Sequence, residues 1–454
     1  METNYLNDTI CAPLTVRGES AIAVLRISGN SSFEIASKIL KLDKDIKKYE
    51  SRKAHLSYII DENNNIIDKI LFTRYERPNS FTGENSIEIS THGSPMIVDK
   101  TMEFIISNGA RLAKKGEFTK RAFINGKMSL TEAESIIDII ESKTETILNS
   151  ATKNLLGKLD KKIKQYSEKL LEILSLLNVS IDFDEEFIED TTWDKINKEI
   201  KKIIKLLKND IDESKKMLKE KRGLVIILLG STNVGKSTLM NVILNENRAI
   251  VSEIAGTTRD YISEEVRIKG HHVRLYDTAG LRENADELEK MGIEKTKELI
   301  DMADIAIYIN DHNNKIDKKL ISHFKENPAT RILTVLNKID KKKNPSDTDD
   351  YDIQISAKEK INVDKLMNKL ILKIEDLTSK ERLDSAIINQ RQLDYFIRLK
   401  NLLDEAVENI KNMPYEEIIS NQIYEAINIL EKIKGKKINE EMLNNIFNRF
   451  CIGK

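Results

Sequence analysis

Residues 230–238, with the sequence GSTNVGKST, fit the pattern G-x-x-x-x-G-K-[ST] of a phosphate-binding loop. The loop follows the apolar run LVIILL and precedes STLMNVIL, which has helical spacing, so it joins a predicted strand to a predicted helix. Backbone N–H groups of such a loop, together with the positive end of the following helix, bind phosphate oxygens. We expect Lys236 to reach the β- and γ-phosphates of a nucleotide and the Ser237 hydroxyl to bind Mg²⁺.

Two later segments could complete the phosphate site. DTAG (277–280) follows the predicted strand HHVRLY, which places Asp277 in the Mg²⁺ shell. AGTTRD (255–260) lies where GTPases order a switch on the γ-phosphate, and Thr258 is the candidate second Mg²⁺ ligand. Many small GTPases carry Gln directly after DTAG to orient the attacking water. Here Leu281 has that position and neither nearby arginine is an obvious arginine finger, so another group must orient the water.

Two further motifs would select the base. NKID (337–340) follows the predicted strand RILTVL. The Asp340 carboxylate can accept hydrogen bonds from N1–H and the exocyclic amine of guanine, which adenine does not offer, while Asn337 and Lys338 brace the base. SAK ends the next strand and places the Ala357 N–H near the guanine carbonyl oxygen. The phosphate loop, DTAG, NKID and SAK (356–358), in this order and each at a strand end, predict a GTP-binding domain. Its expected contact residues are Val234, Gly235, Lys236, Ser237, Thr238, Thr258, Asp277, Thr278, Ala279, Gly280, Asn337, Lys338, Asp340, Ser356, Ala357 and Lys358.

Composition restricts the class of protein. The chain of 454 residues is long enough for about three domains. It carries 73 Lys+Arg against 74 Asp+Glu, so it is no basic nucleic-acid wrapper, and any RNA contact requires a local patch or a partner. Two cysteines make no disulfide framework, which favours a reducing, cytoplasmic setting. The first residues do not resemble a signal peptide, and the apolar runs are too short to cross a bilayer.

Apolar spacing predicts where these motifs sit in the chain. Residues 1–120 read as an α+β domain, with strands at 20–28, 54–60, 68–75 and 85–91 and helices at 31–40 and 96–109. Helical spacing then follows over residues 121–219 and returns over 380–454. Between these stretches, residues 220–379 alternate strands and helices, which is typical of a mostly parallel sheet. We therefore predict an α/β P-loop GTPase domain inserted into a discontinuous helical domain.

Two details of the helical region are specific enough to check. SLTE (129–132) fits a capping box, in which Ser129 caps a free N–H and Glu132 reaches back. Apolar residues recur every three or four positions from Leu155 to Ile181, which predicts one helical stripe of about seven turns.

The motifs together resemble the MnmE (TrmE) family of bacterial tRNA modification GTPases. The resemblance runs along the whole chain, through LRISG (25–29), PNSFTGE (78–84), GEFTKRAFINGK (116–127), AGTTRD, DTAGLRE (277–283) and FCIGK (450–454). It implies an amino-terminal domain that binds 5-formyltetrahydrofolate and dimerises the protein. It also implies a flavoprotein partner, MnmG (GidA), with which the family modifies carbon 5 of the wobble uridine in certain tRNAs. The one-carbon unit comes from a formyl- or methylene-tetrahydrofolate.

The resemblance also assigns residues. The folate contacts would be Arg26, Glu88, Lys127 and Lys454, although Arg26 alone would be read as a surface cation on a strand. Cys451 would act at the folate site, where a thiol could serve as acid–base or nucleophile; its local sequence alone favours a small apolar plug on a helix.

The family activates hydrolysis with K⁺, which supplies charge as an arginine finger does. The matching ligands are Asn233, the backbone of Ser252 and Ile254, and Thr257, and the matching water-orienting acid is Glu289. Two departures, Ser231-Thr232 in the phosphate loop and VRGESAIAV near the amino end, remove none of these side chains. The alternative is a nucleotide switch in ribosome assembly, which would not need FCIGK or the amino-terminal motifs.

Overall fold

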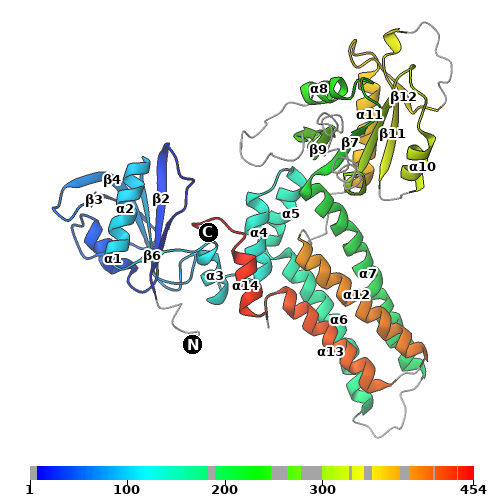
Figure 1. The fold of residues 1–454 in the computed structure, drawn as a ribbon. Helices are drawn as coiled ribbons and strands as arrows, with labels where there is room; N and C mark the ends of the chain where they lie inside the picture. Colours follow the sequence, from blue (N-terminus) through cyan, green and yellow to red (C-terminus); the bar gives the residue numbers. More distant parts are fainter. Residues whose placement is uncertain are drawn as a thin grey trace, which may run out of the picture. The chain divides into compact units, whose positions relative to one another are not determined.

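The computed structural model describes residues 8–181, 190–246, 263–277, 299–326, 330–341, 350–378, 389–412, 415–436 and 438–454 (Figure 1). The chain forms two compact units. The first consists of Met1–Ile140, Asn154–Ser175 and Ser420–Lys454, and the second of Glu141–Lys153 and Leu176–Ile419. In the described part of the chain, no helix has both the length and the apolar character that a membrane span requires.

The first unit contains a six-stranded sheet in the order β3-β4-β5-β2-β1-β6. Its strands are β1 (Ile10–Pro13), β2 (Ser20–Ser28), β3 (Ala54–Ile60), β4 (Ile66–Tyr75), β5 (Ser86–Gly93) and β6 (Arg111–Leu112). All neighbours are antiparallel except β1 and β6. Helices α1 (Ser32–Ile39) and α2 (Pro95–Ser107) share a buried core with one face, which includes Leu25, Ile27 and Phe72. The predicted α+β fold is confirmed.

The opposite face of this sheet is exposed, because buried and exposed side chains alternate along its strands. Leu56 of β3 pairs with Leu71 of β4, and these side chains are 60% and 45% exposed. Ile22 of β2 is 59% exposed. Arg26 lies four residues further along β2, so it points to the same side as Ile22.

The remaining helices that begin or end in the first unit are α3 (Glu117–Ile124), α4 (Leu130–Ile140), α5 (Glu145–Leu155), α6 (Lys158–Ile181), α13 (Glu416–Ile433) and α14 (Glu440–Phe447). The predicted capping box is confirmed, because Ser129 N–H donates to Glu132 Oε2 at 2.8 Å and Glu132 N–H donates to Ser129 Oγ at 3.1 Å. The single stripe predicted from Leu155 to Ile181 is wrong at its start. Leu155 ends α5, and a two-residue turn precedes α6, whose face buries Leu159, Ile163, Tyr166, Leu170 and Ile173.

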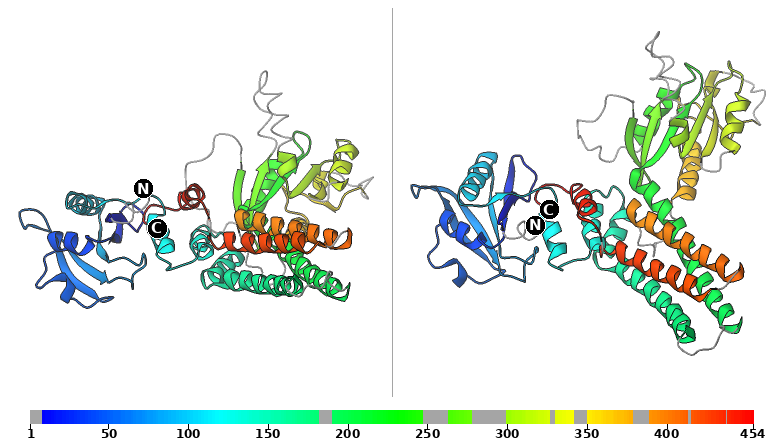
Figure 2. Two further views of the ribbon diagram at one scale, coloured as in Figure 1. Left: turned by 90° about the horizontal axis from the view of Figure 1, so that it is seen from below. Right: turned by 60° about the horizontal axis from the view of Figure 1, so that its bottom comes forward.

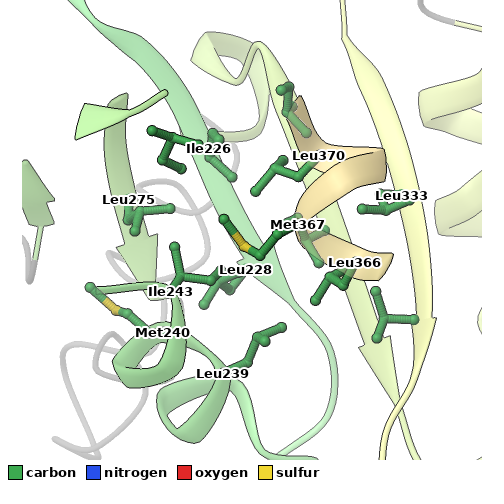
Figure 3. Close-up of a cluster of buried hydrophobic side chains, with 14 of the residues drawn as sticks. Ile226, Leu228, Leu239, Met240, Ile243, Leu275, Leu333, Leu366, Met367 and Leu370 are labelled. Carbon is green, nitrogen blue, oxygen red and sulfur yellow. The ribbon is translucent and has the colours of Figure 1, made fainter. Parts of the chain in front are cut away.

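The second unit contains the predicted mostly parallel sheet, in the order β12-β11-β10-β7-β9-β8. Its strands are β7 (Leu224–Leu229), β8 (Ser263–Ile268), β9 (His271–Asp277), β10 (Ile305–Asn310), β11 (Arg331–Leu336) and β12 (Ile353–Gln354). Only β8 runs antiparallel to its neighbour. Figure 3 shows one face packed against α8 (Lys236–Glu246) and α11 (Val363–Leu377). On the other face, α10 (Lys318–Glu326) contributes Ile321 and Phe324.

A long helix leads into this sheet. Helix α7 (Asp190–Arg222) packs along α12 (Gln390–Asn412) and ends one residue before β7, as Figures 1 and 2 show. Buried Asp304, at the start of β10, fastens its last turn. The Asp304 carboxylate lies 2.8 Å from Arg222 Nη2 and 3.1 Å from Lys219 Nζ, and it also accepts the Val225 N–H at 3.1 Å.

Candidate functional site

The phosphate-binding loop lies between β7 and α8, as its motif predicts. Lys236 is buried, and its ammonium donates to the carbonyl oxygens of Gly230 at 2.9 Å and Ser231 at 2.8 Å. The charge is therefore held over the loop rather than in solvent. Asn233 has φ +61° and an exposed side chain, so its amide projects from the loop.

The two described residues that were assigned to the Mg²⁺ shell lie together. Ser237 Oγ donates to Asp277 Oδ2 at 2.6 Å. Asp277 is the last residue of β9 and pairs with Leu228 of β7, so the parallel register brings it to the start of α8. Hydroxyl and carboxylate oxygens are ligands that suit Mg²⁺, and the arrangement fits that ion.

Asn337 connects the phosphate loop to the SAK motif. Its Nδ2 donates to the Val234 carbonyl at 2.8 Å, and its Oδ1 accepts the Ala357 N–H at 3.0 Å. Gly235 has φ +101°, and a Cβ there would lie 2.3 Å from Asn337 Nδ2. The close approach of the loop to Asn337 therefore requires glycine.

Asp340 and Lys338 complete the base motif. Asp340, in the short 3₁₀ helix Ile339–Lys341, is exposed and accepts a hydrogen bond from Ser356 Oγ at 2.6 Å. This bond lowers the pKa of the Asp340 carboxyl, which keeps it an ionised acceptor. Lys338 donates to the Asn233 carbonyl, and its Nζ lies 2.8 Å from Asp311 Oδ2. Lys358 is exposed and points to Glu359 at 3.7 Å.

Several predicted residues lie outside the described part of the chain. They are Ser252, Ile254, Thr257, Thr258, Thr278, Ala279, Gly280 and Glu289.

A second cluster forms on the amino-terminal sheet around Arg26. Arg26 and Glu88 are opposite each other in the β2–β5 register, and Arg26 Nη2 lies 2.7 Å from Glu88 Oε1. The guanidinium carbon lies 4.8 Å from the ring centroid of Phe81 and 5.4 Å from that of Phe118. Tyr75 OH donates to Glu88 Oε2 at 3.4 Å, and burial together with the Glu88 charge raises the Tyr75 pKa. Two predicted folate residues thus form an ion pair among aromatic rings.

The last described residues lie against the same cluster. The N–H of Phe118 donates to the Lys454 carbonyl at 3.2 Å, and the N–H of Gly116 donates to the Cys451 carbonyl at 3.4 Å. Gly453 has φ +98°, and a Cβ there would meet the Pro13 carbonyl oxygen at 2.2 Å. Residues 451–454 are thus fitted between the end of β1 and the start of α3.

The two cysteines have opposite environments. Cys451 is exposed, so it is not the buried plug that its local sequence favours. Cys11 is fully buried in the sheet core, and burial raises the pKa of its thiol to about 12. Of the two thiols, that of Cys451 is therefore the one that solvent and ligands can reach.

Lys127 is exposed and lies over the loop that carries Phe81. Its Cγ would be 3.2 Å from a Cβ on Gly83, so its stem covers this loop. Among the described residues, Lys127 makes no hydrogen bond or ion pair with Arg26 or Glu88.

Two residues that support these sites were missed in the sequence. Arg121, fully buried on α3, contacts Glu84 Oε1 at 3.1 Å and Glu117 Oε1 at 3.2 Å, and so ties the Phe81 loop to the helix that carries Phe118. Asp311 is the partner of Lys338. The available signals were an arginine on the apolar face of a predicted helix and an acid directly after a buried strand.

Comparison with known proteins finds relatives along nearly the whole chain. The model of the MnmE helical domain matches residues 130–451, and that of the GTP-binding protein TrmE N-terminus matches residues 9–127. Three similar proteins bear the name tRNA modification GTPase MnmE. Those of Thermoanaerobacter sp. (strain X514) and Clostridioides difficile (strain 630) are 38% identical, and the match covers 98% and 99% of this chain and 99% and 100% of theirs. That of Thermotoga maritima is 37% identical, over 98% of this chain and 100% of its own.

Proposed function

The chain belongs to the MnmE family of tRNA modification GTPases, and from this premise we propose that it hydrolyses GTP to drive modification of carbon 5 of the wobble uridine in certain tRNAs. The modification adds an aminomethyl or carboxymethylaminomethyl group, with a one-carbon unit from a formyl- or methylene-tetrahydrofolate and with the flavoprotein MnmG (GidA) as partner. The observation that carries the proposal is the nearly full-length match, because it includes the amino-terminal site as well as the GTPase motifs. A switch in ribosome assembly needs only the latter.

In the nucleotide site, Lys236 exchanges two loop carbonyls for phosphate oxygens when GTP binds. Ser237 and Thr258 would hold Mg²⁺, which would offset the negative charge of the nucleotide phosphates. The short Ser237–Asp277 hydrogen bond supports this role, because a carboxylate there orients the hydroxyl toward the ion.

Asn233, Ser252, Ile254 and Thr257 would hold K⁺, which would supply further positive charge to stabilise the reacting phosphates. The Asn233 carbonyl is engaged by Lys338, and its exposed side chain is left for the cation, which supports this assignment. Glu289 orients the attacking water in place of the missing Gln.

In the amino-terminal site, Arg26, Glu88, Lys127 and Lys454 bind a tetrahydrofolate. The cations suit the glutamate tail of the folate. Glu88 Oε2 can accept hydrogen bonds from pterin N–H groups, since its only described partner is Tyr75, through a long hydrogen bond. Phe81 and Phe118 add flat apolar surface beside Arg26. Cys451, which lies in the segment that adjoins Phe118, takes part in the one-carbon transfer.

The exposed face of the amino-terminal sheet supports a homodimer. Ile22, Leu56 and Leu71 are large apolar residues without cover, and such a face favours burial by a second copy of the chain. Arg26 is on the same face, so dimerisation would enclose the folate site. The protein would work in the cytoplasm with tRNA and the flavoprotein.

A complementation experiment tests the proposal. The gene is deleted, and tRNA nucleosides are measured by mass spectrometry after expression of wild type, Lys236→Ala or Cys451→Ser. We expect the deletion and both variants to lack the wobble modification. Unchanged wobble uridines in the deletion strain would leave only the switch, and equal GTP turnover in K⁺ and Na⁺ would remove the K⁺ mechanism.

A further inference from the structure

Two neighbouring strands of the GTPase sheet end in similar polar pairs. β10 ends at Asn310 and is followed by Asp311, while β11 is followed by Asn337 and Lys338. The strands are parallel, and the Asn337 N–H donates to the Asn310 carbonyl at 2.7 Å. This register puts Asp311 directly beside Lys338, although the two are 27 residues apart in sequence.

The Asp311 carboxylate is buried, with 4% of the residue exposed, and its oxygens are engaged. Oδ1 accepts from Asn314 Nδ2 at 2.8 Å and from the Asn313 N–H at 3.1 Å, and Oδ2 accepts from Lys338 Nζ at 2.8 Å. Burial opposes ionisation, but these hydrogen bonds outweigh it and lower the Asp311 pKa. The group is a fixed negative charge aimed at one lysine.

Lys338 in turn joins two parts of the nucleotide site. Its ammonium contacts Asp311 on one side and the Asn233 carbonyl of the phosphate loop on the other. A lysine side chain loses much rotamer freedom when it is fixed, and a buried counter-ion offsets that cost before the nucleotide binds.

We propose that Asp311 is a positioning residue for guanine-nucleotide binding, which holds Lys338 against the phosphate loop without touching the nucleotide. The proposal rests on the proposed GTPase function and on the base motif described with the candidate site. It predicts that affinity for GDP and GTP depends on Asp311 only through Lys338. We expect the hydrolysis rate at saturating GTP not to depend on Asp311, because among the described residues it bonds to Asn313, Asn314 and Lys338 and to no residue of the proposed phosphate and Mg²⁺ site.

A double-mutant cycle in the full-length protein tests this dependence. Affinity for a fluorescent GDP analogue is measured for wild type, Asp311→Asn, Lys338→Ala and the double variant. The D311N variant lacks a charge-assisted hydrogen bond, so its affinity for the GDP analogue should be about tenfold or more below that of wild type. GTP turnover should show a raised KM with kcat within about twofold of wild type. In the K338A background, D311N should cost nothing further.

The matched control is Asp350→Asn. Asp350 lines the same surface pocket as Asp311, but its carboxylate pairs with exposed Lys318 at 3.4 Å, so its loss should leave GDP affinity unchanged. If D311N does not fold, Asn314→Ala removes one donor to Asp311 and should give the same pattern with a smaller, several-fold loss.

Three outcomes would overturn the inference. Wild-type affinity in D311N, or in N314A where that variant replaces it, removes the positioning role. Equal losses from D311N with and without Lys338 mean a general structural effect. Wild-type affinity in K338A would contradict the proposed role of Lys338 in the base site. The proposed nucleotide contacts would then be wrong, whatever the result for Asp311.

Discussion

In the nucleotide site, the described residues follow the carboxyl ends of parallel strands, each in a short motif that contains its own loop. In the amino-terminal site, Arg26 and Glu88 come from the middle of antiparallel strands, Phe118 from a helix, and Cys451 from a segment more than three hundred residues away. Parallel strand ends meet at one edge, so local motifs suffice to build the first site. The second depends on register and on the docking of a distant segment. A substitution in the nucleotide site should therefore act locally, whereas the amino-terminal site should also be sensitive to substitutions in a distant segment of the chain.

Lys236→Ala is expected to give the largest difference in effect between the nucleotide site and the amino-terminal site. This change removes the cation that we propose binds phosphate, so GTP turnover should fall by at least about 10²-fold. Binding of 5-formyltetrahydrofolate, measured by calorimetry, should be unchanged. Lys369→Ala, an exposed lysine on α11, is the control and should retain both. A parallel loss of folate binding would mean that the sites are not independent.

Asp340→Asn should have the next largest effect, and it acts on base selection. The amide reverses one donor–acceptor pair, so GTP affinity should fall by about 10²-fold while xanthosine triphosphate is admitted. Competition binding with the two nucleotides measures the change. Retained preference for GTP would show that guanine is read by another group.

Gly453→Ala probes the amino-terminal site through its distant segment. The new Cβ would clash with the Pro13 carbonyl, so residues 451–454 should leave α3, and folate affinity should fall about tenfold with the loss of one to two kcal/mol of contacts. GTP affinity should stay at the wild-type value. Ile452→Ala, at the exposed neighbour, is the control. Normal folate binding by G453A would show that residues 451–454 do not contribute to the amino-terminal site.

The smallest effect is a change in pH dependence. The hydrogen bond from Ser356 lowers the Asp340 pKa, so the proposed binding of guanine by this carboxylate should persist to a lower pH than an ordinary aspartate allows. Ser356→Ala should return this pKa toward its usual value. The loss of GDP affinity on acidification should then begin at a higher pH. Superimposable pH profiles would contradict the role of Ser356.

The difference between the sites also explains what the sequence could predict. The strand–loop–helix order around Lys236 and the position of Asp277 follow from local spacing, and the structure has both where they were expected. The SLTE capping box is equally local. Apolar spacing overran the end of α5 because the turn after Leu155 does not interrupt the period.

Other features could not be predicted without tertiary pairing. Arg26 meets Glu88 only because β2 and β5 pair in one particular register, which single strands do not specify. Asp311 and Arg121 are unremarkable in sequence, since buried charges reveal themselves through partners that the fold brings to them. The family resemblance assigned Arg26 and Glu88 separate ligand roles, whereas the structure also pairs them with each other.

The Asp304 anchor turns α7 into a lever arm. With 33 residues at about 1.5 Å each, the helix is roughly 50 Å long, and the anchor prevents its last turn from slipping against β7 and β10. If the sheet tilts by about 5° as phosphate contacts form or break, the far end of a 50 Å helix sweeps through roughly 4 Å. A small rotation of the sheet would therefore appear as a displacement of several ångströms at the far end of α7.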